Sequence, residues 1–133
     1  MSTVKPIANA THDYCINNAV IHIKDLRLRT FIGFNPEELE KQQDIVINAE
    51  IEFDASKPCI SDDERETLDY KVITKAMIAH VEQGRFRLIE KLCADLLDII
   101  MGEPSVLRAT ISVDKPHALR FSDSVAVSLT AVR

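Results

Sequence analysis

The sequence contains few of the residues that nucleotide-binding and base-stacking proteins need. Its 133 residues include 3 glycines, no tryptophan and 5% aromatic residues. The glycines lie far apart, at Gly33, Gly84 and Gly102, whereas a Walker loop or a dinucleotide-binding fingerprint needs several close together. Scarce aromatic side chains also argue against a platform for stacking nucleic-acid bases. Any phosphate contact must therefore come from side chains or from an ordinary helix end.

Positive charge and long apolar runs are also in short supply. The chain has 16 Lys and Arg residues against 21 Asp and Glu residues, which gives a formal net charge of -5. Binding to bulk nucleic acid or to anionic lipid is disfavoured, because both need cationic neutralisation. No stretch approaches the roughly 18 consecutive apolar residues of a membrane span. We therefore expect neither a nucleic acid nor a membrane as a partner.

Cysteine and histidine patterns argue against the common disulfide and metal frameworks. The three cysteines form no C-x-x-C pair, and their odd number fits reduced thiols in the cytoplasm. No two of the four histidines lie three to five residues apart, so no local pair of metal ligands exists. The sequence predicts a cytoplasmic protein without a metal site.

Alternating apolar residues predict four β-strands, each with one apolar face. The clearest alternation covers residues 45–53, and similar patterns cover residues 20–28, 107–113 and 125–131. In the first strand the alternation changes phase, which predicts a bulge near Asp25. The opposite faces are polar but carry many Ser, Thr and Asn residues. Because such a sheet has two open edges, we expect subunits to join sheet to sheet.

Between the second and third strands the period becomes helical. Asp69 can cap a helix that continues to about Val81, and a second apolar stripe extends from Leu88 to Ile100. The order β-β-α-α-β-β predicts one α+β domain, with a four-stranded antiparallel sheet and two helices on one of its faces. This domain covers residues 19–133. Residues 1–18 show no clear period and are expected to form a loose N-terminal extension.

Four polar residues fall at places where they can take part in chemistry. Glu38 lies in the turn between the first two strands, Tyr70 and Glu90 begin the two helices, and Lys115 ends the third strand. Each also has an ordinary structural explanation, such as an exposed carboxylate, an ion pair of Glu90 with Arg87, or a lysine that protects a sheet edge. Spacing alone favours the structural explanations.

The order and spacing of several short motifs resemble the dihydroneopterin aldolase family. These motifs are Gly33-x-x-x-x-Glu38 followed by Gln43, Leu68-Asp69-Tyr70, Leu88-Ile89-Glu90-Lys91-Leu92 and Val113-Asp-Lys115-Pro116. The resemblance extends from about residue 20 to the C-terminus. Residues 26–33 and 117–125 are most similar to the epimerase branch of the family.

The resemblance implies a T-fold (tunnelling fold). Four subunits would close their sheets into one barrel, two such rings would stack as an octamer, and each active site would lie between subunits. Glu90, assisted by the backbone around Ile89, would anchor the amino-pyrimidine edge of a pterin. Leu68 and Tyr70 of the neighbouring subunit would cover its ring.

The resemblance further implies a reaction without a cofactor. Lys115, Glu38 and Tyr70 would handle protons while the 2'-carbon of dihydroneopterin triphosphate is inverted through retro-aldol and aldol steps, towards tetrahydromonapterin. His117, Arg120 and Arg29 would hold the triphosphate. Two alternatives remain open: an aldolase of folate biosynthesis that releases glycolaldehyde, and a pterin-binding ring without catalytic activity.

Overall fold

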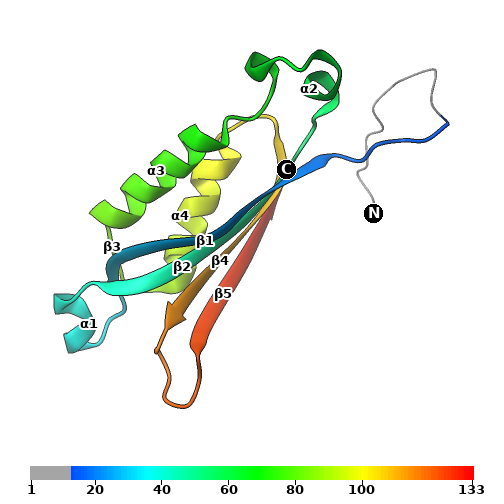
Figure 1. The fold of residues 1–133 in the computed structure, drawn as a ribbon. Coiled ribbons are helices and arrows are strands. Elements are labelled where there is room, and N and C mark those ends of the chain that lie inside the picture. The colour runs from blue at the N-terminus through cyan, green and yellow to red at the C-terminus, as the bar shows by residue number, and fades with distance from the viewer. Residues whose placement is uncertain (1–12) are drawn as a thin grey trace.

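The structure, a computed structural model, describes residues 13–133 and has the predicted α+β organisation (Figure 1). Residues 13–18 form neither helix nor strand. The first twelve residues lie outside the described part, so the loose extension over residues 1–18 stays a prediction. The elements, in chain order, are β1 (Ala19–Ile32), α1 (Pro36–Glu40), β2 (Gln43–Phe53), α2 (Ser56–Ser61), a 3-10 helix (Glu64–Glu66), α3 (Tyr70–Gln83), β3 (Arg85–Phe86), α4 (Ile89–Met101), β4 (Val106–Pro116) and β5 (Ser124–Val132).

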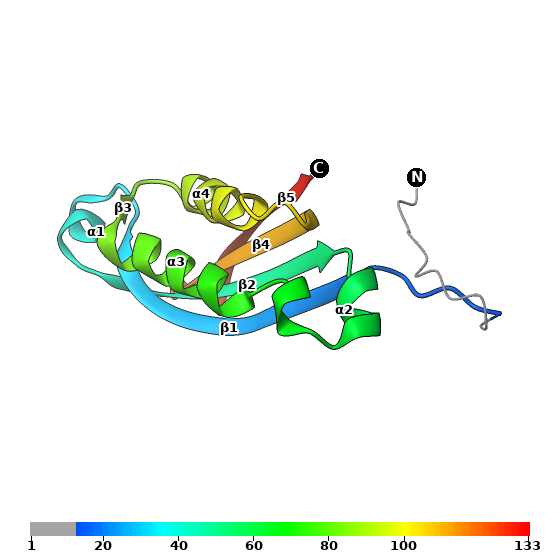
Figure 2. The ribbon, with the colours of Figure 1, turned by 90° about the horizontal axis from the view of Figure 1, so that it is seen from above.

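The strands form one sheet in the order β3-β1-β2-β4-β5, and β1 curls strongly along its length (Figure 2). The four long strands pair antiparallel, as predicted. The expectation of exactly four strands is wrong, because β3 adds a short parallel strand that pairs Phe31 with Arg85 and Ile32 with Phe86. Two residues are too few to produce an alternating pattern in a sequence.

The predicted bulge in β1 is confirmed. The register of β1 against β2 changes between Ile23 and Leu26, and Asp25 has a φ of 52°. Its backbone N–H donates a hydrogen bond to the Asn48 side chain at 2.9 Å. A short polar residue such as Asp tolerates this left-handed backbone better than most others. The bulge keeps the apolar residues on both sides of it on the same face of the sheet.

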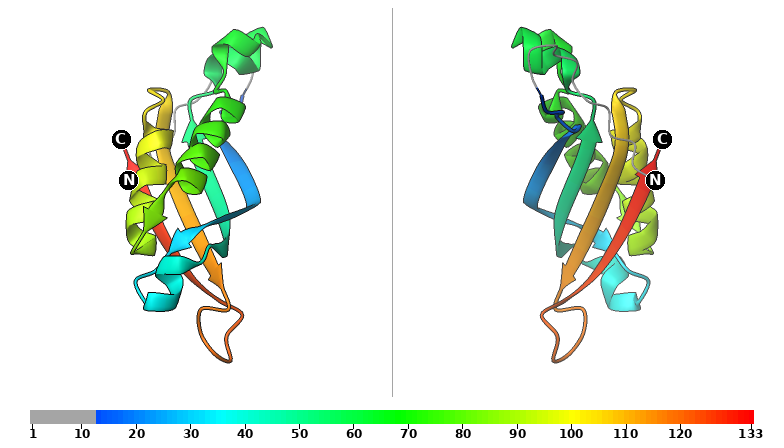
Figure 3. Two further views of the ribbon diagram at one scale, coloured as in Figure 1. Left: turned by 90° about the vertical axis from the view of Figure 1, so that its left-hand side faces the viewer. Right: turned by 90° about the vertical axis from the view of Figure 1, so that its right-hand side faces the viewer.

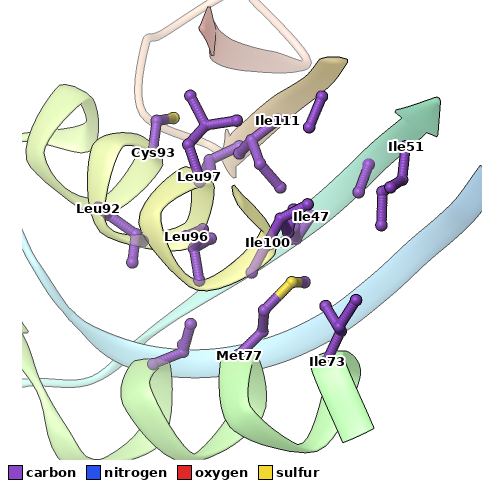
Figure 4. Packing of buried hydrophobic residues seen from close by; sticks show 14 of the residues in the cluster. Ile47, Ile51, Ile73, Met77, Leu92, Cys93, Leu96, Leu97, Ile100 and Ile111 are labelled. Carbon is purple, nitrogen blue, oxygen red and sulfur yellow. The ribbon is translucent and has the colours of Figure 1, made fainter. Parts of the chain in front are cut away.

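Helices α3 and α4 cover one face of the sheet, and the main core lies between these two layers (Figures 2 and 3). Asp69 caps α3 as predicted, since its carboxylate accepts hydrogen bonds from the backbone of Lys71 at 3.0 Å and Val72 at 3.3 Å. Burial of apolar side chains is the main force that holds the layers together. Figure 4 shows part of this core, which includes Ile47, Ile51, Met77, Leu92, Leu96, Ile100 and Ile111.

The opposite face of the sheet is polar and no helix covers it (Figure 3). A row of cross-strand partners runs over it from His22 through Glu50 and Thr110 to Thr130. No helix formed by residues 13–133 is long and apolar enough to cross a membrane.

Candidate active site

Lys115 and Glu38 meet at one end of the sheet. Lys115 lies near the end of β4 and is only 9% exposed. Its ammonium group donates a hydrogen bond to Oε2 of Glu38, whose side chain is 20% exposed. This hydrogen bond is the main reason why the pKa of Glu38 lies below its usual value. The Glu38 carboxylate is therefore ionised at neutral pH and is held by a cation.

The segment from Gly33 to Gln43 places the Glu38 carboxylate. Gly33 has a φ of +125°, and a Cβ atom there would lie 2.3 Å from the Glu38 carboxylate carbon. The backbone N–H of Asn35 donates to Glu38 Oε1 at 3.3 Å. The Gln43 amide donates both to Glu38 Oε2, at 3.3 Å, and to the Ile32 carbonyl, at 2.6 Å. The glycine leaves room for the carboxylate, and the amide ties it to the end of β1.

Glu90 and Ile89 begin α4 at the same end of the molecule (Figures 1 and 3). Glu90 is exposed and Ile89 is half-buried. No side chain caps this helix, whose free N–H groups and dipole favour a negative charge in the first turn. Within residues 13–133, Glu90 forms no ion pair with Arg87, so this explanation for it is wrong.

Leu68 and Tyr70 lie at the other end of the molecule, where α3 begins (Figure 1). Leu68 is buried and Tyr70 is 52% exposed. Together with Ile21, Ile23 and Phe53 they line an apolar groove of about 820 Å³. A single chain therefore does not bring Tyr70 to Lys115 and Glu38, and a site that contains all three needs two copies of the chain.

His117 and Arg120 lie in the loop between β4 and β5, just beyond Lys115. His117 has a φ of 61°, and its backbone N–H donates to the Asp123 carbonyl at 3.3 Å. The Arg120 guanidinium is exposed and lies 5.2 Å from the ring centroid of Phe121. In the described chain it forms no ion pair with Asp123. The sequence predicted both residues as ligands of one phosphate tail, and this loop carries both.

A second groove, of about 720 Å³, brings His117 close to Arg29. Arg27 and Pro116 also line it, as do the carboxylates of Asp44 and Glu82. Arg29 forms an exposed ion pair with Asp44 at 3.3 Å, and its Nη2 donates a hydrogen bond to the Gln42 carbonyl at 3.0 Å. Arg120 is not among the residues that line this groove.

Sequence reasoning missed Thr30, which is fully buried next to the site. Its hydroxyl donates to the Val81 carbonyl at 2.6 Å and so fastens β1 to the end of α3. The signal was available, because Thr30 is the one polar residue in the apolar alternation of residues 26–32. A buried hydroxyl needs a partner, and the unpaired carbonyls at a helix end supply one.

Comparison with known proteins agrees with this geometry. The sequence model of the family described as "FolB: Dihydroneopterin aldolase" matches residues 21–130. A dihydroneopterin triphosphate 2'-epimerase from Pseudomonas aeruginosa is 47% identical over 115 residues, which are 86% of this chain and 94% of the relative. The same enzyme from Escherichia coli K12 is 49% identical over 112 residues, 84% of this chain and 93% of the relative.

A solved structure shows the same fold. The crystal structure of Escherichia coli dihydroneopterin aldolase in complex with neopterin matches with a TM-score of 0.80 and 26% identity. The match covers 85% of this chain and 98% of that one.

Proposed function

Because the chain belongs to the dihydroneopterin aldolase family and has its T-fold, we propose that it inverts the 2'-carbon of 7,8-dihydroneopterin triphosphate. The product is dihydromonapterin triphosphate. One observation carries the choice of reaction: the chain is far more similar to the two epimerases than to the aldolase of known structure. The fold does not separate the two activities, because members with either one share it.

The functional assembly is a ring of four chains, and two rings stack as an octamer. Three observations support it. Within the described chain, β5 has an unpaired outer edge and β3 covers only the last two residues of the outer edge of β1. The polar sheet face is uncovered, and the two groups of site residues lie at opposite ends of one chain. Closing a sheet into a barrel removes its open edges. The site then forms where two chains meet.

The pterin ring binds at the start of α4. The Glu90 carboxylate accepts two parallel N–H bonds from the amino-pyrimidine edge, each contributing about 1.5–3 kcal/mol for a charged acceptor. The backbone at Ile89 adds polar contacts. Leu68 and Tyr70 of the neighbouring chain cover the ring, which fits their position in an apolar groove.

The reaction uses Lys115, Glu38 and Tyr70 as proton carriers. Removal of the 2'-hydroxyl proton lets the C1'–C2' bond break, and its electron pair moves into the neighbouring C=N bond of the ring, whose nitrogen takes up a proton. Lys115 is the central acid and base, with Glu38 beside it and Tyr70 from the neighbouring chain as relays. The aldehyde fragment turns and adds back through its other face. The ring itself accepts the electrons, so this route needs no cofactor.

An epimerase must hold the cleaved aldehyde until it adds back. The triphosphate on that fragment supplies a handle, and the cations beyond Lys115 hold it: His117, Arg120 and Arg29. The positions of these three residues support this role. His117 and Arg120 lie in the β4–β5 loop, and His117 and Arg29 line the same groove next to it. Charge-assisted contacts from arginine suit phosphate oxygens.

A cytoplasmic location is supported by the cysteines. Cys15 and Cys59 are exposed and unpaired. Cys93 is buried, and burial is the main reason why its pKa is raised to about 11. Free exposed thiols persist in a reducing compartment.

One assay tests the proposed reaction against its alternatives. The purified protein is incubated with dihydroneopterin triphosphate and, separately, with dihydroneopterin, and chromatography resolves the stereoisomers and the hydroxymethyl cleavage product. We expect the dihydromonapterin isomer to dominate with the triphosphate. Dominant cleavage would make the protein an aldolase, and the absence of both products would favour a binding ring without catalytic activity.

A further inference from the structure

The two-residue strand β3 connects the two parts of the site that one chain carries. It pairs with the end of β1 through Phe31 and Ile32. One residue further on, the backbone N–H of Gly33 donates to the Phe86 carbonyl at 2.8 Å. Glu38 lies five residues after Gly33, and Glu90 lies four residues after Phe86, so both segments that carry these carboxylates leave the same junction.

Arg85 of β3 also contacts α1 directly. Its Nη1 donates a hydrogen bond to the Leu39 carbonyl at 3.1 Å. Its guanidinium carbon lies 3.8 Å from the ring centroid of Phe31, within the range of a cation–π contact. Leu39 is the residue after Glu38, so a single side chain joins β3, the end of β1 and the backbone that carries the carboxylate.

Helix α1 is held by polar contacts of Glu38 and buries no apolar side chain. It has five residues, none of them buried. Helices this short are unstable alone, because nucleation is unfavourable and few hydrogen bonds follow it. The last carbonyls of a helix also lack partners within it. The Arg85 bond satisfies one of these carbonyls from outside the helix.

We propose that Arg85 is a positioning residue for the reaction. It holds α1 so that Glu38 stays in contact with Lys115 and at a fixed position relative to Glu90. Arg85 acts through Glu38 and not on the substrate. The inference rests on the proposed roles of Glu38 and Lys115. Small displacements of catalytic groups cost large factors in rate, which is why such groups need rigid support.

Kinetics of Arg85→Ala provide the first test. We expect kcat to fall at least about tenfold while KM changes less than about threefold, since the pterin anchor at Glu90 remains. The acidic limb of the pH–rate profile should move to higher pH, because Glu38 loses the contact that lowers its pKa. Arg85→Lys keeps a cation and a donor and should recover most of the rate. Arg65→Ala, which removes an exposed arginine paired with Asp63, is the control.

Amide hydrogen exchange gives a readout that does not depend on activity. In Arg85→Ala the amides of residues 38 and 39, which bond to the Asn35 carbonyl, should exchange at least about tenfold faster, while those of α3 and α4 stay protected. Phe31→Leu should change the kinetics and the amide exchange in the same direction as Arg85→Ala, but by a smaller amount. If Arg85→Ala does not fold, Phe31→Leu tests whether the contact with Arg85 holds α1.

Two results overturn the proposal: kinetics of Arg85→Ala equal to those of Arg65→Ala, or unchanged exchange at residues 38 and 39. If the wild-type protein epimerises nothing, the proposed function fails, and the exchange experiment still decides whether Arg85 holds α1.

Discussion

Glu38 and Lys115 are 77 positions apart in the sequence, yet their side chains form an ion pair at the end of the sheet. The lysine comes from a long strand that packs under α4, whereas the glutamate comes from a five-residue helix on the surface. One partner is thus held by the core and the other by polar contacts. A proton donor and acceptor placed side by side in this way suit acid–base chemistry.

The first prediction concerns the loss of either partner. Lys115→Ala and Glu38→Gln should each lower kcat by about 10²- to 10⁴-fold, the usual contribution of a general acid or base. Lys57→Ala, an exposed lysine on α2, is the matched control and should leave kcat within twofold, to be compared by steady-state kinetics under identical conditions. Rates for Lys115→Ala close to those of this control would exclude Lys115 from proton transfer.

The second prediction concerns stability against pH. The hydrogen bond from Lys115 lowers the pKa of Glu38 below its usual 4.5. A carboxylate with a lowered pKa stabilises the folded state fully above its unfolded-state pKa, and this contribution disappears as the pH falls through the folded-state value. The difference in free energy of unfolding between the wild type and Glu38→Gln should therefore be largest near neutral pH and shrink below about pH 4.5.

Urea unfolding at several pH values between about 3 and 7 measures this difference. A difference that stays constant over the whole range would mean that Glu38 gains nothing from Lys115 in the folded state.

Sequence patterns predicted those parts of the molecule that repeat over many residues. The alternation in residues 45–53 gave β2, Asp69 gave the start of α3, and the phase change at Asp25 gave the bulge. Each of these signals is local, so the sequence contains it without reference to the rest of the chain.

The remaining features depend on contacts between distant residues. Strand β3 forms where Arg85 pairs with Phe31 at the end of β1. A strand of two residues is too short to produce a local pattern in the sequence. The pairing of Glu38 with Lys115 was likewise invisible to spacing alone. Their positions in the sequence marked both residues as candidates, but only the family resemblance gave them a shared role, and their contact agrees with it.

The third prediction concerns Gly33. Gly33→Ala should lower activity at least tenfold and destabilise the fold by about 1–3 kcal/mol, because the φ of +125° is strained for alanine and its Cβ would meet the Glu38 carboxylate at 2.3 Å. Gly102→Ala is the control, since its nearest contact would be 3.3 Å and its backbone is helical. Kinetics and thermal unfolding of both variants decide the matter. Equal effects would show that Gly33 has no special role in placing Glu38.

The fourth prediction follows from the positions of Tyr70 and Lys115 at opposite ends of one chain. Lys115→Ala and Tyr70→Ala should each be nearly inactive alone. When the two are unfolded, mixed in equal amounts and refolded together, about one quarter of the sites between subunits should contain both native residues. Activity should then return to about a quarter of the wild-type value. Each variant refolded alone is the control, and a mixture as inactive as its components would mean that no site combines Lys115 of one chain with Tyr70 of its neighbour.

The last prediction concerns retention of the cleaved fragment. Arg120→Ala and His117→Ala should raise KM for dihydroneopterin triphosphate by about 5- to 50-fold, the loss expected for one or two charge-assisted phosphate contacts, and should leave KM for dihydroneopterin nearly unchanged. The share of cleavage product should also rise, because an aldehyde that is held less firmly leaves before it adds back. Chromatography of the products gives the share directly, and Arg65→Ala, remote from this loop, should change neither quantity. If Arg120→Ala discriminates between the two substrates as well as the wild type does, Arg120 does not hold the triphosphate, and Arg29 and its neighbour Arg27 in the second groove become the residues to substitute next.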